Sequence, residues 1–110
     1  MPYIKQENRK NLDSAINELA KKIVEESNKD KNEAAFAGLL NYACTRLALK
    51  ILKDKFAGIR YWLIATTSGV FKNVGDEFYR RLASPYEDKQ IAQNGDVDLY
   101  KEYLEEINKK

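Results

Sequence analysis

The stretch Glu77–Asp96, EFYRRLASPYEDKQIAQNGD, decides where the helices in the second half of this chain begin and end. Ser84 is a favourable N-cap residue, Pro85 suits the first helical position, and Glu87 lies three residues after the cap. The sequence therefore predicts that one helix ends before Ser84 and that a short helix starts there with a capping box. The short helix is expected to end at Asn94-Gly95, since both residues tolerate a left-handed backbone.

Three longer helices are predicted before this stretch. Asp13 is expected to cap the first, which carries one apolar stripe and ends near Ser27. The second runs from about residue 33 to 56 and is the most apolar segment, so we expect neighbours on two of its sides. The third spans about residues 59–83.

Two glycines lie inside the third predicted helix. Gly69 and Gly75 each cost about 1 kcal/mol relative to alanine in a helix interior. The expected compensation is the close approach of a neighbouring helix. An alternative is that Gly75 marks a break and Asp76 caps a new helix.

A last helix follows the Asn94-Gly95 turn, with Asp96 or Asp98 as its expected cap. Its apolar residues recur at helical spacing, at Val97, Tyr100, Leu104 and Ile107. The sequence thus predicts an all-α fold, a small antiparallel bundle of about four helices plus a short connecting helix. Residues 1–110 are expected to form a single helical domain.

The composition excludes several classes of site. The chain has 110 residues, one cysteine (Cys44) and no histidine, so a disulfide within the chain is impossible and a structural zinc site is not expected. No familiar catalytic or cofactor-binding motif is present, and we expect a non-enzymatic protein without cofactor. No stretch has the composition of a signal peptide or about 18 uncharged apolar residues, so we expect a cytoplasmic protein without a membrane partner.

Charge is unevenly distributed along the chain. The net charge is +2, but residues 45–81 carry eight basic and three acidic groups, whereas residues 82–110 carry four basic and seven acidic groups. One interpretation is that the two segments neutralise each other by packing or across a dimer contact. The other is that the basic segment is a surface for an anion.

The candidate ligand-binding residues cluster around the predicted helix end. They are Tyr79, Arg80, Arg81, Tyr86 and Asp88. One interpretation is a pocket for a small anionic ligand, because arginine forks pair with anions and tyrosine rings offer stacking faces. The alternative is a structural corner, in which an arginine pairs with the available acids Glu87, Asp88 and Asp96. Glu77 and Arg81, four residues apart, are a further expected pair.

A second candidate surface lies on the most apolar helix. Asn41 and Thr45 are four residues apart, as are Tyr42 and Arg46, so each pair shares a helix face. These residues are expected to form an interface, or a second wall of the ligand site. Seven tyrosines and one tryptophan also favour an interface, although they could equally fill a small core.

Several motifs resemble a family of small uncharacterised proteins, carrying a domain of unknown function, from bacterial, archaeal and phage genomes. They are the opening MPYIKQENR, the NYxxTRL segment at residues 41–47, and EFYRR, PYED and NGDV within residues 77–97. The resemblance implies no activity, ligand or catalytic residue. The chain departs from the family pattern at Gly75 and in continuing with a helix after Val97.

Three functions are compatible with these observations. The first is an interaction module that self-associates, as a homodimer, through residues 42–46 and the last helix. The second is a binder of a small anionic ligand such as a nucleotide; the resemblance to a family that occurs in phage genomes is compatible with a role as an antagonist or a ligand sponge. The third is nucleic-acid binding through residues 45–81, which the small net charge disfavours.

Overall fold

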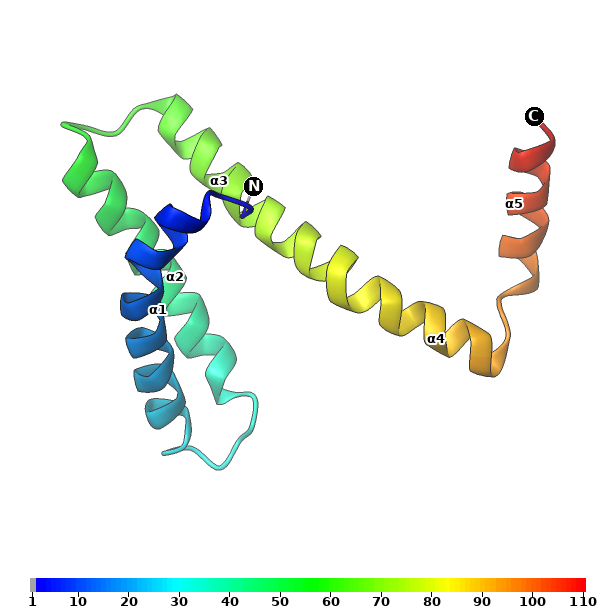
Figure 1. Cartoon of the computed structure of the whole chain (residues 1–110), viewed down its shortest axis with the longest axis horizontal. Helices are drawn as coiled ribbons and strands as arrows, with labels where there is room; N and C mark the ends of the chain where they lie inside the picture. The colour runs from blue at the N-terminus through cyan, green and yellow to red at the C-terminus, as the bar shows by residue number, and fades with distance from the viewer. Residues whose placement is uncertain (1) are drawn as a thin grey trace. The chain divides into compact units, whose positions relative to one another are not determined.

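The computed structural model describes residues 2–110, which form helices joined by short loops (Figure 1). No strand occurs in this part of the chain, so the all-α prediction is confirmed. The helices are α1 (Gln6–Ser27), α2 (Ala35–Lys55), α3 (Tyr61–Phe78), the π-helical turn η1 (Tyr79–Ala83), α4 (Ser84–Asn94) and α5 (Asp98–Lys109).

The chain divides into two compact units, Met1–Val70 and Phe71–Lys110, which we call unit 1 and unit 2. The boundary falls inside α3. Each unit is described by itself, and the single domain expected over residues 1–110 stays a prediction.

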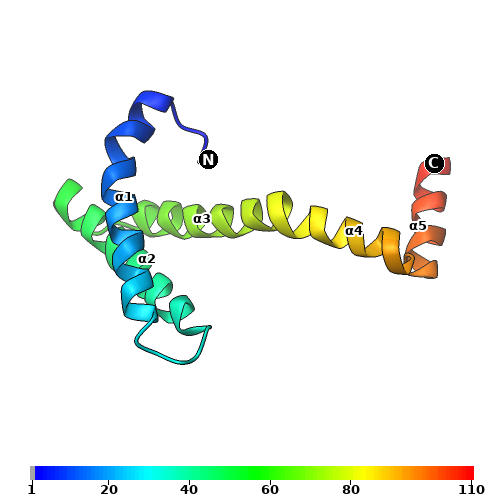
Figure 2. The same cartoon turned by 60° about the horizontal axis from the view of Figure 1, so that its bottom comes forward.

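Unit 1 is built on a hairpin in which α1 and α2 lie side by side and run in opposite directions (Figures 1 and 2). The loop between them is held by Asp30, whose Oδ1 accepts from the Asn32 amide at 2.8 Å, and by Asn32, whose Oδ1 accepts from the Ala34 amide at 3.0 Å. These are side-chain turns typical of Asp and Asn.

Helix α1 begins earlier than expected, so the prediction that Asp13 caps it is wrong. The Arg9 amide already donates to the Lys5 carbonyl at 3.1 Å, and Asp13 lies in the third turn. The polar residues at positions 6–11 carry no proline or glycine that would stop a helix, which lets α1 extend toward the N-terminus.

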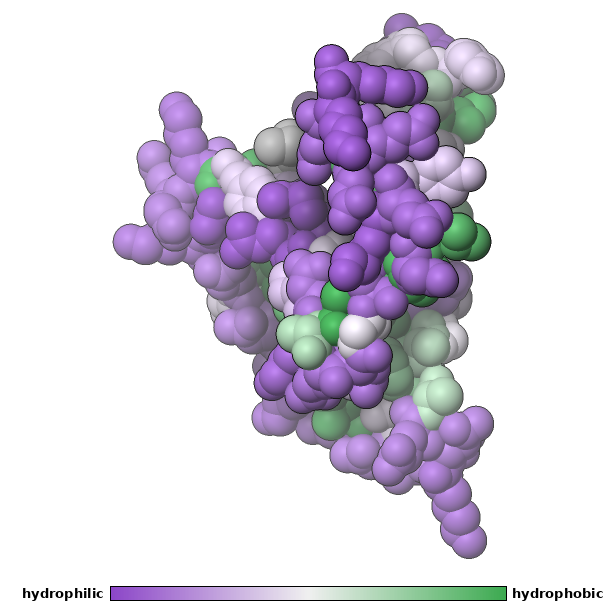
Figure 3. Space-filling model, turned by 90° about the vertical axis from the view of Figure 1, so that its right-hand side faces the viewer, coloured by the Kyte–Doolittle hydropathy of each residue, from purple (hydrophilic) through white to green (hydrophobic). Residues whose placement is uncertain are grey.

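Little apolar surface is buried in either unit. Among residues 2–110 only Leu63, near the start of α3, is fully buried, with 3% of its surface exposed. The half-buried residues of α2 lie on two sides of the helix, Ala35, Leu39 and Ala43 on one and Cys44, Ala48 and Leu52 on the other. Phe36, Leu47 and Ile51 remain more than half exposed. Figure 3 shows one side of the molecule, where apolar side chains (green) reach the surface between hydrophilic ones (purple).

Helix α2 has the length and composition of a helix that could cross a membrane, contrary to the prediction that no stretch of the sequence does. Core helices of soluble proteins meet the same criterion. Arg46 lies near its middle, and an arginine at the centre of a membrane-spanning helix costs about 2.5–3.5 kcal/mol on insertion scales. Arg46 therefore argues against a membrane-spanning role.

In unit 2 the helix does not restart at Ser84, and the capping-box prediction is wrong. Residues 61–94 are helical without a break. Ser84 has helical angles (φ −60°, ψ −48°), its side chain makes no capping hydrogen bond, and its amide donates to the carbonyl of Tyr79, five residues back. The expected end at Gly95 is observed, with φ +85°.

Pro85 gives the physical reason for this π-helical turn. Proline has no amide hydrogen, and in a regular α-helix its ring meets the carbonyl four residues earlier, here that of Arg81. One extra residue in the turn shifts that carbonyl away, so the helix continues past the proline.

Helix α5 follows the Gly95 turn, but neither expected aspartate caps it. The side chains of Asp96 and Asp98 accept only from the amides of the next residues, Val97 and Leu99, at 2.7 Å and 2.9 Å. Every residue of α5 is exposed.

The glycines of α3 have no close neighbour of the kind we expected. A Cβ atom built on Gly69 or Gly75 has no heavy atom of the described chain within 4 Å, apart from its own helix backbone and chain neighbours. Close approach of another helix within this chain therefore does not explain them.

Candidate functional site

The candidate ligand residues lie on η1 and α4, where Tyr79 and Glu87 are joined. The Tyr79 hydroxyl lies 2.9 Å from Oε2 and 3.0 Å from Oε1 of Glu87, and donates to that carboxylate. Glu87, expected to be a capping partner of Ser84, instead links the π-helical turn to α4. Sequence reasoning missed this pair because it depends on the shape of the helix.

The extra residue of η1 makes this contact possible. In a regular α-helix, residues eight apart are about 80° apart around the axis, and residues seven apart come closer to one face. The widened turn takes up one residue, so residues eight apart share a face across η1.

The carboxylate changes the acidity of the phenol. The hydrogen bond to Glu87, together with the negative charge of that group, raises the pKa of Tyr79 above its ordinary value. The Tyr79 phenol therefore keeps its proton at neutral pH and donates it to the Glu87 carboxylate in the hydrogen bond.

Arg80 is engaged by Glu77. Its Nε donates to Oε1 at 2.7 Å and its Nη2 donates to Oε2 at 3.1 Å, a two-point pair between groups three residues apart. Glu77 was expected to pair with Arg81, and that prediction is wrong. The half-buried Glu77 carboxylate thus occupies the fork that would bind an anionic ligand.

The other candidate residues are exposed. Arg81, Tyr86 and Asp88 lie on the surface of unit 2, and Tyr86 has 67% of its surface exposed. No hollow that we describe is lined by any of them. Within residues 2–110 no group of three Asp, Glu or Cys side chains could hold a metal ion.

The second candidate surface forms a hollow on α2. The Thr45 hydroxyl donates to the backbone carbonyl of Asn41, four residues back, at 2.8 Å. This hydroxyl therefore has a hydrogen-bond partner within the helix. Tyr42, Thr45 and Arg46 line a hollow of about 380 Å³ together with Leu49, Lys50 and Lys53.

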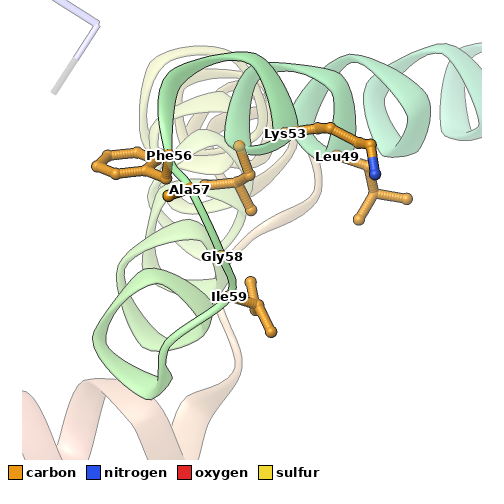
Figure 4. Close-up of a pocket in the computed structure, with 7 residues that line it drawn as sticks. Leu49, Lys53, Phe56, Ala57, Gly58 and Ile59 are labelled. Atoms are coloured by element: carbon orange, nitrogen blue, oxygen red, sulfur yellow. The ribbon is translucent and has the colours of Figure 1, made fainter.

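A second hollow continues from the first toward the end of α2. It measures about 450 Å³ and shares Leu49 and Lys53 with the first (Figure 4). Its remaining lining residues come from the last turn of α2 and the loop after it: Leu52, Phe56, Ala57, Gly58 and Ile59. We call the two hollows together the α2 groove.

The groove combines apolar and basic side chains. Arg46, Lys50 and Lys53 contribute positive charge, and Lys50 also pairs with Asp54 at 3.0 Å. Sequence reasoning found the first turn of this surface but missed Leu49 through Ile59. The spacing of Tyr42, Arg46, Leu49 and Lys53, four, three and four residues, was the signal that could have extended it.

The two candidate surfaces belong to different units, the α2 groove to unit 1 and the Tyr79 residues to unit 2. The idea that both form walls of one ligand site therefore stays a hypothesis.

Comparison with known families identifies one family whose model matches most of the chain. The model of a family described as a domain of unknown function, DUF6899, matches residues 1–97. The chain belongs to this family. Neither a curated protein nor a solved structure matches the chain. The match includes both candidate surfaces and ends directly before α5.

Proposed function

We propose that this protein is a non-enzymatic interaction module that works by self-association, with a second copy covering its apolar faces. The observation that carries the proposal is that, among residues 2–110, Leu63 alone is fully buried, so most large apolar side chains remain exposed. Monomeric soluble proteins seldom expose large contiguous apolar faces, and such faces commonly mark contacts between proteins.

Unit 2 supports the proposal most directly. It has forty residues, none of them buried, and its exposed large apolar side chains run from Phe71 to Ile107. Segments of about this size usually need a disulfide, a metal or oligomerisation to be stable. Unit 2 has no cysteine and no metal-binding cluster of the kind noted above, so association is the one of these three means that its residues offer.

Burial of the exposed apolar side chains of unit 2 would supply enough free energy to hold two copies together. Full burial of a Leu, Ile or Phe side chain contributes roughly 1.5–3 kcal/mol. Phe78 and Leu82 are 65% and 64% exposed, and Leu104 and Ile107 are 55% and 63% exposed, so each retains most of that contribution for a contact. The exposed tyrosines of unit 2 fit the same purpose, because tyrosine is enriched in protein interfaces.

The test is the molar mass in solution. Light scattering coupled to size-exclusion chromatography, repeated over a hundredfold range of concentration, should give a multiple of 12.7 kDa. Because association stabilises only the folded state, the urea midpoint should rise with protein concentration. A monomer at every concentration, with a concentration-independent midpoint, would overturn the proposal.

A further inference from the structure

Helix α5 offers an apolar stripe without cover. Its twelve residues bring Tyr100, Tyr103, Leu104 and Ile107 to one side of the helix, each between 55% and 66% exposed. The helix also carries four acidic and two basic residues. A short amphipathic helix with acidic character suits a groove that is apolar and basic.

The α2 groove has these properties. Its apolar lining includes Leu49, Phe56 and Ile59, and Arg46, Lys50 and Lys53 supply its charge. The first hollow extends from Tyr42 to Lys53, twelve residues of helix, which is the length of α5, about 18 Å.

We propose that α5 of one copy docks lengthwise in the α2 groove of a second copy. This inference rests on the proposed self-association and names its surfaces. Charge supports it: Arg46, Lys50 and Lys53 line the groove, whereas α5 carries four acidic and two basic residues. Glu106, which borders the apolar stripe, has a long 3.9 Å contact with Lys110, the residue that follows α5.

The arrangement has a physical rationale at the groove as well. Arg46 and Lys53 alternate with Tyr42 and Leu49 along it, so their aliphatic stems add to the apolar floor while their charged ends reach its edge. Glu106, beside the stripe of α5, then meets a cation beside the groove, which orients the helix and disfavours a like-charged partner.

Helix α5 lies outside the residues that the family model matches. The matched residues end at Val97, whereas the groove lies wholly inside them. The proposed contact therefore joins a surface within the family domain to a helix outside its matched range.

Disulfide trapping tests the contact. In a Cys44→Ser background, one full-length chain carries Leu49→Cys and another carries Leu104→Cys. Mixed under mild oxidation, they should form a disulfide-linked heterodimer on a non-reducing gel. Glu102→Cys replaces Leu104→Cys in the control, because residue 102 lies on the opposite side of α5 from the stripe, and its yield should be at least several-fold lower.

A single chain that carries both Leu49→Cys and Leu104→Cys shows whether α5 binds the groove of its own chain instead. An internal disulfide without a heterodimer in the mixture would overturn the inference, since α5 would then bind its own chain. No disulfide in a protein that scattering shows to be dimeric would also overturn it, but would leave self-association intact. No disulfide in a protein that is monomeric would overturn both.

Charge exchange gives an independent readout. Lys53→Glu and Glu106→Lys should each weaken association about five-fold, the effect of one exposed ion pair. The double variant should recover most of the loss. Additive weakening in the double variant would show that these two groups do not face each other.

Discussion

The Tyr79 hydroxyl lies 2.9 Å from Oε2 of Glu87, eight residues further along one uninterrupted helix. That contact crosses η1, where Ser84 donates to the carbonyl five residues back. The proline that seemed to start a new helix instead widens an existing one, and the widening aligns the phenol with the carboxylate.

The first prediction concerns the acidity of Tyr79. Glu87→Gln removes the negative charge that raises the pKa of Tyr79, so this pKa should fall toward its ordinary value of about 10. The difference between the ultraviolet titrations of each protein and its Tyr79→Phe variant isolates this one tyrosine among the seven.

The same pair gives stability a defined pH dependence. A raised pKa in the folded state means that the folded protein binds the phenolic proton more tightly than the unfolded chain. The contribution is therefore complete below about pH 10 and is lost as the pH rises through the folded-state value. An unchanged Tyr79 titration in Glu87→Gln would contradict the hydrogen bond.

The second prediction concerns the origin of η1. Pro85→Ala restores an amide hydrogen and removes the ring, so the helix should return to the α-helical pattern. Tyr79 and Glu87 would then lie about 80° apart around the axis, and the pKa of Tyr79 should fall as in Glu87→Gln. Backbone ¹³C chemical shifts over residues 79–86 report the change.

Stability separates this explanation from a helix restart. Proline costs about 3 kcal/mol relative to alanine in a helix interior, and η1 relieves part of that cost, so Pro85→Ala should stabilise the protein by less than about 3 kcal/mol. Ser84→Ala should change stability by no more than about 0.5 kcal/mol, since Ser84 is not a cap. A loss of about 1 kcal/mol in Ser84→Ala would instead indicate the capping box.

The sequence predicted the helices well where their ends carry unambiguous signals. The polar loop after Ser27 and the Asn94-Gly95 turn were located correctly. Aspartate and asparagine side chains accept hydrogen bonds from nearby backbone amides there, and glycine adopts a positive φ. Ser84-Pro85 was misread because the same dipeptide suits a first turn or a widened turn. Only the hydrogen bonds of the neighbouring carbonyls decide between them.

The candidate site was harder to predict than the fold. Sequence spacing identified Arg80 and Arg81 but selected the wrong partner for Glu77, because the i,i+3 and i,i+4 positions are nearly equivalent on a helix. It identified Tyr42 to Arg46 but not the groove beyond, because the second hollow also needs the loop at Phe56–Ile59. Such a loop conformation is not encoded by helical periodicity.

The third prediction concerns small anionic ligands. Since Glu77 already occupies the Arg80 fork and Arg81 lines neither hollow, phosphate and nucleotides should not raise the melting temperature. A ligand at 100 times its dissociation constant would add about 2.7 kcal/mol, which thermal unfolding detects easily. A reproducible shift that disappears in Arg81→Ala would revive the anion-binding hypothesis.

The fourth prediction uses the glycines of α3. Gly75 lies on one stripe with Phe71, Phe78 and Leu82, while Gly69 lies about 120° around the helix from it. Among residues 2–110, neither has a neighbour within 4 Å that would meet a Cβ atom, apart from its own helix backbone and its chain neighbours. In an isolated helix, alanine at either position should therefore stabilise by about 1 kcal/mol.

Self-association should make the Gly69→Ala and Gly75→Ala variants behave differently. If a second copy covers the Phe71–Leu82 stripe, the methyl group of Gly75→Ala meets it, so the dissociation constant of the dimer should rise while the helix itself becomes more stable. Gly69→Ala is the matched control, with the same gain in helix stability and unchanged association. Sedimentation velocity over a dilution series measures both. Equal behaviour of the two variants would show that the stripe remains open to solvent in the dimer.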